Sequence, residues 1–126
     1  MKTIHTDKAP AAIGPYSQAI AAQGFIYTSG QIPLNPQTGV IEAEGIETQT
    51  EQAILNLKAV LEAAGSGLEN VVKTTCFLQH MNDFAAFNGV YEKYFTGKPA
   101  RSCVEVGALP KGALVEIEAV AVAGEN

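Results

Sequence analysis

Residues 99–103, Pro-Ala-Arg-Ser-Cys, include the side chain best suited to bind a small anion. Side chains alternate along a β-strand, so Arg101 and Cys103 are expected to point to one face. Arg101 lies between Pro99-Ala100 and an apolar strand, which predicts a partly desolvated guanidinium. Its planar fork then favours a carboxylate. A structural ion pair with one of the thirteen acidic residues explains Arg101 equally well at this point.

Two acids, Glu116 and Glu118, share one face of a strand that otherwise consists of Val, Ile and Ala. Burial raises the pKa of a carboxyl group, and such a group can act as a general base or acid near neutrality. Two solvated carboxylates on an exposed face are the alternative. We expect only one of the pair to be functional.

Cys103 has no His or Asp in a recognisable nucleophile pattern, so a small buried residue is the better interpretation than a thiolate nucleophile. His5, His80 and the two cysteines, Cys76 and Cys103, make no zinc-binding spacing. We therefore predict no metal.

Two further positions are candidates for a pocket. Ser29-Gly30 ends a predicted strand, and a glycine there lets a ligand approach the backbone closely; an ordinary bulge is the alternative. Tyr16 follows the turn-forming pair Gly14-Pro15 and offers a hydroxyl group to a pocket. Packing at the rim is the alternative for Tyr16.

The elements that position these residues follow from local patterns. Residues 18–22 and 25–29 predict a hairpin around Gln23-Gly24, and residues 40–41 a short third strand. Apolar residues at helical spacing predict a helix over 46–64 that ends at Gly65.

A strand over 71–79 comes next, because this stretch is rich in β-branched residues. Asn82 is the expected N-cap of a second helix with an aromatic face, and Gly97 and Pro99 end that helix. Residues 100–106 and 114–122 predict the last strands. The order is β-β-β-α-β-α-β-β, an α+β chain with one mixed sheet and both helices on one face.

The last strand is apolar on both sides. Leu114, Val120 and Val122 lie on one side, and Val115, Ile117 and Ala119 on the other. A strand buried on both faces needs helices on one face and something else on the other. Another subunit is the natural candidate.

The amino-acid composition argues against several classes of function. The 126 residues fit one domain, 1–126, and 47% are apolar. The net charge of −5 and the scattered basic residues argue against nucleic-acid and anionic-membrane surfaces. The sequence shows no signal peptide and no apolar run of about 20 residues, and the two cysteines form no disulfide framework. These observations predict a cytoplasmic protein.

Several segments, in order along the chain, resemble the signature segments of the reactive intermediate deaminase (Rid) family, of the RidA type. The resemblance extends from about Ile4 to Val122. The segments are residues 12–17 (AIGPYS), 28–33 (TSGQIP), 99–104 (PARSCV), 109–112 (LPKG) and 115–119 (VEIEA).

The resemblance implies a chorismate-mutase-like fold and a homotrimer whose sheets face inward as a barrel, with sites at the subunit clefts. It implies hydrolysis of reactive 2-imino acids to 2-keto acids and ammonia without cofactor or metal. Arg101 would bind the substrate carboxylate, and Glu116 would orient or activate water. The cleft would be lined by Tyr16, Ser29, Gly30, Asn88 and Cys103.

Three other functions are compatible with such a cleft. A regulatory module could bind a keto acid there, although the presence of both Arg101 and Glu116 favours an enzyme. An endoribonuclease or translation inhibitor is disfavoured by the acidic charge. No sequence feature supports or excludes a chaperone-like activity.

Overall fold

The structure is a computed structural model that describes residues 1–124. Over this range it contains one six-stranded sheet with the strand order β1-β2-β3-β6-β4-β5. The strands are β1 (Lys2–Ile4), β2 (Ala19–Ala22), β3 (Phe25–Thr28), β4 (Val71–Leu78), β5 (Ala100–Glu105) and β6 (Val115–Val122). The helices are α1 (Gly45–Ala63) and α2 (Phe84–Tyr94), and short 3-10 turns cover Leu68–Asn70, Met81–Asp83 and Pro110–Gly112.

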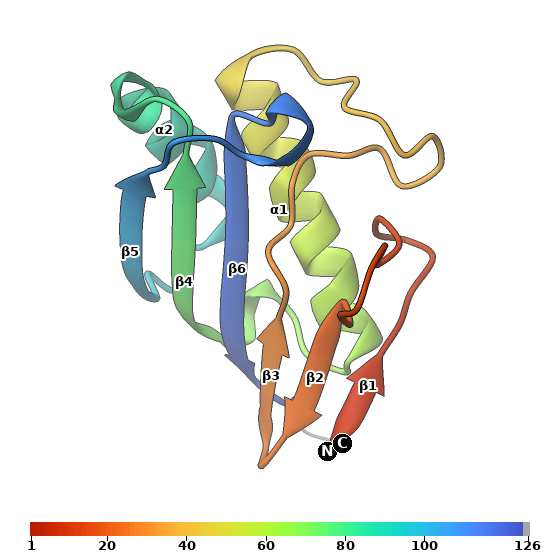
Figure 1. Ribbon diagram of the computed structural model, residues 1–126. Coiled ribbons are helices and arrows are strands. Elements are labelled where there is room, and N and C mark those ends of the chain that lie inside the picture. The colour runs from red at the N-terminus through yellow and green to blue at the C-terminus, as the bar shows by residue number, and fades with distance from the viewer. Residues whose placement is uncertain (125–126) are drawn as a thin grey trace.

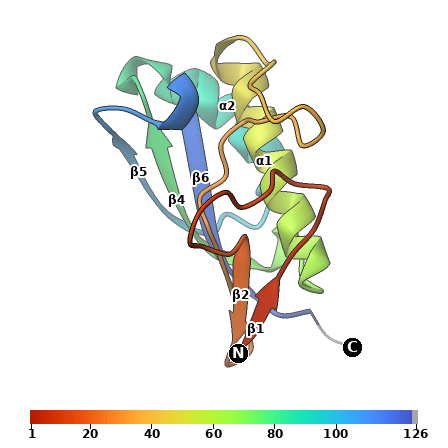
Figure 2. The same cartoon turned by 45° about the vertical axis from the view of Figure 1, so that its right-hand side comes forward.

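The sheet is mixed, because β4 and β5 run parallel while all other neighbours are antiparallel. Helix α1 connects β3 to β4, and α2 connects β4 to β5. Both helices lie behind the sheet in Figure 1, and the turned view in Figure 2 shows them on the same side. The predicted α+β class, with both helices on one face, is confirmed.

Helix α1 forms because its apolar residues recur at helical spacing. Its fully buried stripe consists of Ala53, Ile54, Leu57, Val60 and Leu61. The helix ends one residue before the predicted boundary, and Gly65 follows with φ 78°, a left-handed conformation that glycine adopts without strain. Among residues 1–124, no helix combines the length and apolar character needed to cross a bilayer.

The edge strand β1 is absent from the sequence-based prediction, and the predicted strand at 40–41 is wrong. In β1 only Ile4 is buried, so three residues are too few to show an alternating pattern. Val40 is exposed and follows a tight turn at Gly39, and Ile41 makes a single bridge to Leu34. The predicted order of elements therefore stands, with β1 taking the place of the misassigned strand.

The start of α2 also differs from the prediction. Asn82 is not the N-cap: it lies within the 3-10 turn, and Asp83 precedes the helix without a side-chain cap hydrogen bond. The backbone N–H of Met81 donates to Glu105 Oε1 at 2.7 Å, which ties this turn to the end of β5. A contact with the sheet thus replaces the expected local cap.

Strand β6 lies in the middle of the sheet and shows strict alternation. Its side chains facing the helices are buried: Val115, Ile117, Ala119 and Ala121. Glu116, Glu118 and Val120 point to the opposite face, which we call the open face, and are only partly buried. The assignment of side chains to the two sides of this strand is confirmed, but within residues 1–124 only the helix-facing side is buried, so burial of both faces stays a prediction.

The long connection from β3 to α1 is held down by one buried amide. Asn56 is 1% exposed, and its Nδ2 donates to the carbonyl oxygens of Ile32 and Leu34 at 3.0 and 2.9 Å. Its Oδ1 accepts a hydrogen bond from Gln52 at 2.9 Å. Asn56 therefore fixes the segment that follows Gly30.

We predict that Asn56→Leu lowers the free energy of unfolding by about 2 to 4 kcal/mol, because two buried carbonyl groups lose their donors. Urea denaturation measures the change. Gln52→Leu is the matched control, since it leaves both carbonyl bonds intact and should cost clearly less. Equal losses in the two variants would contradict the role given to Asn56.

Candidate functional site

A hollow of about 690 Å³ opens beside the end of β3 and the open face of β6. We call it the acidic hollow, because Glu116 and Glu118 both line it. Three of the predicted substrate-binding residues lie here: Tyr16, Ser29 and Gly30. The remaining lining residues are Pro10, Ala11, Ile13, Gln18, Gln31, Ile32, Leu34, Pro110 and Lys111.

Glu116 lies directly over Gly30. A methyl group added at Gly30 would overlap the Glu116 carboxylate and come within 2.8 Å of Cδ. The pairing of Gln31 with Ile117 sets this distance, with N–H to O distances of 2.8 and 3.1 Å in the two directions. Gly30 therefore allows a close approach of the Glu116 carboxylate, whereas the approach of a ligand stays a prediction.

Ser29 shapes the hollow through a bond to the backbone. Its hydroxyl donates to the carbonyl oxygen of Ser17 at 2.6 Å, and its N–H donates to the carbonyl of Gln18 at 2.9 Å. These bonds hold the turn that carries Tyr16, whose side chain is 53% exposed at the rim. Among residues 1–124 the Tyr16 hydroxyl makes no hydrogen bond, while the Ser29 hydroxyl is already engaged.

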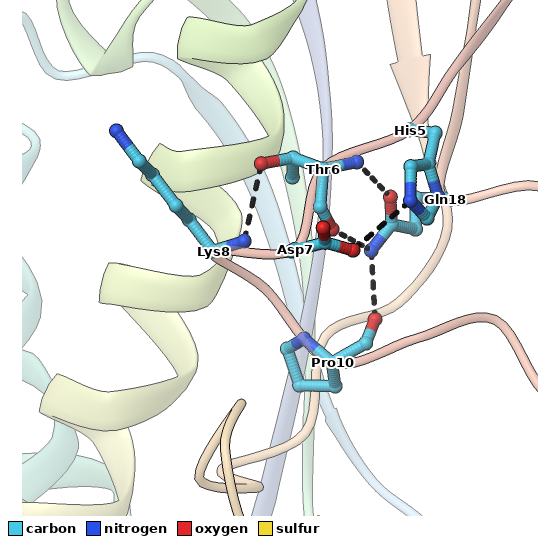
Figure 3. Close-up of polar contacts among 6 residues, drawn as sticks. All are labelled: His5, Thr6, Asp7, Lys8, Pro10 and Gln18. Atoms are coloured by element: carbon cyan, nitrogen blue, oxygen red, sulfur yellow. Dashed lines mark hydrogen bonds and ion pairs between the residues drawn. The ribbon is translucent and has the colours of Figure 1, made fainter.

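The N-terminal wall of the hollow is fixed by Gln18, which is buried. Its Oε1 accepts from the N–H of Thr6 at 2.7 Å, and its Nε2 donates to the carbonyls of Thr6 and Pro10 at 3.0 and 2.8 Å (Figure 3). All of its side-chain bonds therefore go to one segment of backbone. These three hydrogen bonds hold Pro10 in place at the wall of the hollow.

Burial raises the pKa of the Glu116 carboxyl above its usual range, and the nearby Glu118 carboxylate raises it further. Half-burial keeps Glu116 accessible from the hollow. A carboxyl group with a raised pKa accepts a proton more readily than an ordinary glutamate and can return it. Glu116 therefore has the properties of an acid–base group.

The other predicted residues form a second group, at the edge strand β5. Arg101 and Asn88 line a hollow of about 390 Å³, which we call the arginine hollow, together with Tyr91, Glu92, Phe95, Lys98 and Pro99. Arg101 Nη1 donates to Asn88 Oδ1 at 2.7 Å. The guanidinium pairs with no carboxylate of residues 1–124, so the structural ion pair considered for it is not formed within this part of the chain.

Cys103 lies two residues beyond Arg101 on the same face and is partly buried. It pairs in register with Cys76 on β4, and both thiols are free. Burial raises the pKa of Cys103, and Arg101 opposes this rise only in part. A raised pKa favours the thiol, in agreement with the interpretation of Cys103 as a small packed residue.

Arg101 and Glu116 point to opposite faces of the sheet. Arg101 pairs in register with Thr74, which is fully buried under the helices, so its side chain lies on the helix side. Glu116 alternates with the buried Val115 and Ile117 and lies on the open face. Within one chain the two predicted catalytic residues therefore do not converge.

Some residues of the two hollows are absent from the sequence-based prediction. Gln18, Gln31 and Lys111 line the acidic hollow. The sequence offered a signal for two of them. Gln18 is a polar residue at the start of an apolar strand, and Gln31 directly follows Gly30. Lys111 adopts φ 57° in the loop before β6, a conformation the sequence does not reveal.

The fold and the two hollows define a small α+β protein with separate carboxylate and guanidinium sites, and the comparisons identify its family. The family described as endoribonuclease L-PSP matches residues 6–123. A RutC family protein of Synechocystis is 61% identical over 125 residues, which cover 97% of this chain and 96% of that protein. The 2-iminobutanoate/2-iminopropanoate deaminase of Escherichia coli K12 is 52% identical over 125 residues, covering 96% and 97%.

Solved structures agree. The crystal structure of E. coli TdcF with bound serine superimposes with a TM-score of 0.92 at 44% identity, covering 97% of this chain and 98% of that one. The chain therefore belongs to the endoribonuclease L-PSP family. The resemblance to reactive intermediate deaminases is confirmed at the level of the family.

The pKa of Glu116 can be tested directly. We predict that Glu118→Gln lowers it, because removing a nearby negative charge makes ionisation of Glu116 easier. Carbon NMR of the Glu116 carboxyl group during a pH titration should show the midpoint moving to lower pH. Glu62→Gln, which removes an exposed carboxyl group on α1, is the control. A midpoint that stays constant or rises in Glu118→Gln would refute the coupling.

Proposed function

We propose that the protein hydrolyses reactive 2-imino acids to 2-keto acids and ammonia. The observation that carries the proposal is Arg101: its guanidinium donates a hydrogen bond to Asn88 and pairs with no carboxylate of residues 1–124. A partly buried cation of this kind favours an anionic ligand, and the planar fork matches a carboxylate. Substrates with a 2-carboxylate are the simplest ligands for it.

The proposed site needs two copies of the chain, because Arg101 and Glu116 lie on opposite faces. Arg101 is on the edge strand β5, where a neighbouring copy can bring its acidic hollow close. The open face also carries exposed apolar side chains, among them Phe25, Tyr27 and Val104. A homotrimer with inward-facing sheets would bury this face and form three clefts.

The proposed reaction uses the two groups in sequence. Arg101 of one copy binds the carboxylate and so places the iminium carbon near Glu116 of the next copy. The Glu116 carboxylate takes a proton from water, and the water oxygen bonds to the iminium carbon to give a carbinolamine. Glu116 then gives its proton to the amino nitrogen and accepts the hydroxyl proton. The C–N bond breaks as C=O forms, and the departing ammonia takes the proton from Glu116, so that the products are ammonium and the 2-keto acid and the carboxylate is restored.

In this mechanism Arg101 positions the substrate, and Glu116 transfers protons. Imines of this kind hydrolyse readily in water, so a modest gain is sufficient. Two relatives support the assignment: the E. coli protein is named a 2-iminobutanoate/2-iminopropanoate deaminase, and TdcF binds serine, a small molecule with a carboxylate. We further propose that the protein acts in the cytoplasm, where free thiols such as Cys76 and Cys103 remain reduced.

The family description also suggests RNA cleavage. The chain carries eight basic against thirteen acidic residues, and its guanidinium lies in a small hollow among aromatic rings. Phosphate backbones are bound by clustered basic residues that displace counterions. The imine activity is therefore the better match to these residues.

We predict that Arg101→Ala lowers the rate enhancement on 2-iminopropanoate on the order of 100-fold, because the substrate is no longer held at a set distance from Glu116. The imine is generated continuously from L-alanine by an amino acid oxidase, and semicarbazide trapping measures how much survives. Circular dichroism checks that the variant is folded.

Lys58→Ala is the matched control, because Lys58 is an exposed cation on α1 outside both hollows. It should clear the imine as fast as the wild type. If Arg101→Ala also matched the wild type, the proposed function of Arg101 would be wrong.

A further inference from the structure

Three aromatic rings of α2 surround the Arg101 guanidinium. The distances from Arg101 Cζ to the ring centroids are 4.8 Å for Tyr91, 5.4 Å for Phe84 and 5.9 Å for Phe87. All three lie within the range in which a cation is attracted to the face of an aromatic ring. Because Asn88 lies on the same helix, one face of α2 supplies both the hydrogen-bond acceptor and the three rings around the guanidinium.

Tyr91 is itself firmly held. Its hydroxyl is 2.8 Å from Thr74 Oγ1, in a hydrogen bond that joins α2 to β4. Its ring stacks on Phe95 with centroids 4.4 Å apart, and only 7% of the residue is exposed. Thr74 is also the register partner of Arg101. The ring therefore has a fixed position relative to the strand from which Arg101 extends.

Asn88 alone would leave the guanidinium free to rotate about a single hydrogen bond. It contacts one nitrogen, Nη1. The rings restrict the remaining freedom, and their negative faces partly compensate the positive charge without a carboxylate, which would compete with a bound anion. The guanidinium therefore has a fixed orientation and, among residues 1–124, an edge that no carboxylate occupies. Both properties favour the binding of an anion.

We propose that Tyr91 and Phe84 are positioning residues that hold Arg101 ready for a carboxylate ligand. This inference rests on the proposed role of Arg101 in carboxylate binding. Tyr91 contributes the closest ring and the anchor to Thr74, whereas Phe84 lies at the partly exposed start of α2. Phe87 is fully buried and serves mainly in the core.

The test compares Tyr91→Leu, Phe84→Leu and Tyr91→Phe. Both leucine variants should raise the apparent KM for 2-iminopropanoate about 3-fold to 30-fold, the range expected for loss of one cation–ring contact, with kcat within about 2-fold. Tyr91→Phe keeps the ring but loses the hydrogen bond to Thr74, so its KM should lie between those of the wild type and Tyr91→Leu. The dissociation constant of 2-oxobutanoate, measured by calorimetry, should follow the same order.

A spectroscopic readout separates positioning from general packing. The Nε–Hε group of Arg101 should show a ring-current shift in the nitrogen–proton NMR spectrum. Loss of a ring in Tyr91→Leu or Phe84→Leu should move this signal toward that of a free arginine. Tyr94→Leu is the matched control, because Tyr94 lies on the same helix but bonds to Glu51 and is not among the rings around Arg101.

Phe84→Leu keeps the inference testable if Tyr91→Leu does not fold. Unchanged KM, unchanged 2-oxobutanoate affinity and an unmoved Arg101 signal in a folded leucine variant would overturn it. If the proposed function itself were wrong, the wild type would not clear the imine. Changes in 2-oxobutanoate affinity and in the Arg101 signal would then still support the positioning role.

Discussion

The alternation of side chains across the central sheet determines how this protein can work. Arg101 extends toward the helices, whereas Glu116 extends to the open face, so the sheet itself separates the two groups. No side-chain rotation within one chain can bring them together, because strand pairing fixes the face of each residue. A reaction that uses both groups therefore needs a second copy, and the exposed apolar residues of the open face give that copy a surface to cover.

The second constraint is the charge of Arg101. A cation removed from water is costly unless it is compensated, and the usual compensation is a carboxylate. Here an amide oxygen from Asn88 and three ring faces of α2 take that place among the described residues. The charge is thus tolerated while part of the guanidinium remains available. The acidic hollow shows the complementary situation, since Glu116 is close to Glu118 and is held over Gly30.

Much of the fold follows from short-range patterns in the sequence. Helix α1, the hairpin around Gln23-Gly24 and strand β6 are long or distinctive enough to be predicted, and both hairpin residues have the positive φ expected for such a turn. Strand β1 is too short, and the start of α2 depends on a contact with Glu105 that is remote in sequence. The separation of Arg101 from Glu116 could not be predicted, because it depends on strand order and register. The motif resemblance named Arg101 and Asn88 as candidates, but not the hydrogen bond between them or the rings of α2 around the guanidinium.

We propose that a working site takes Arg101 from one copy and Glu116 from another. Mixing two inactive variants, Arg101→Ala and Glu116→Gln, after joint unfolding and refolding tests it most directly. Mixed oligomers would contain some clefts with both native residues, so imine hydrolysis should return to a substantial fraction of the wild-type rate, while each variant refolded alone stays inactive. Absence of any recovery in mixtures shown to contain both chains would contradict the shared site.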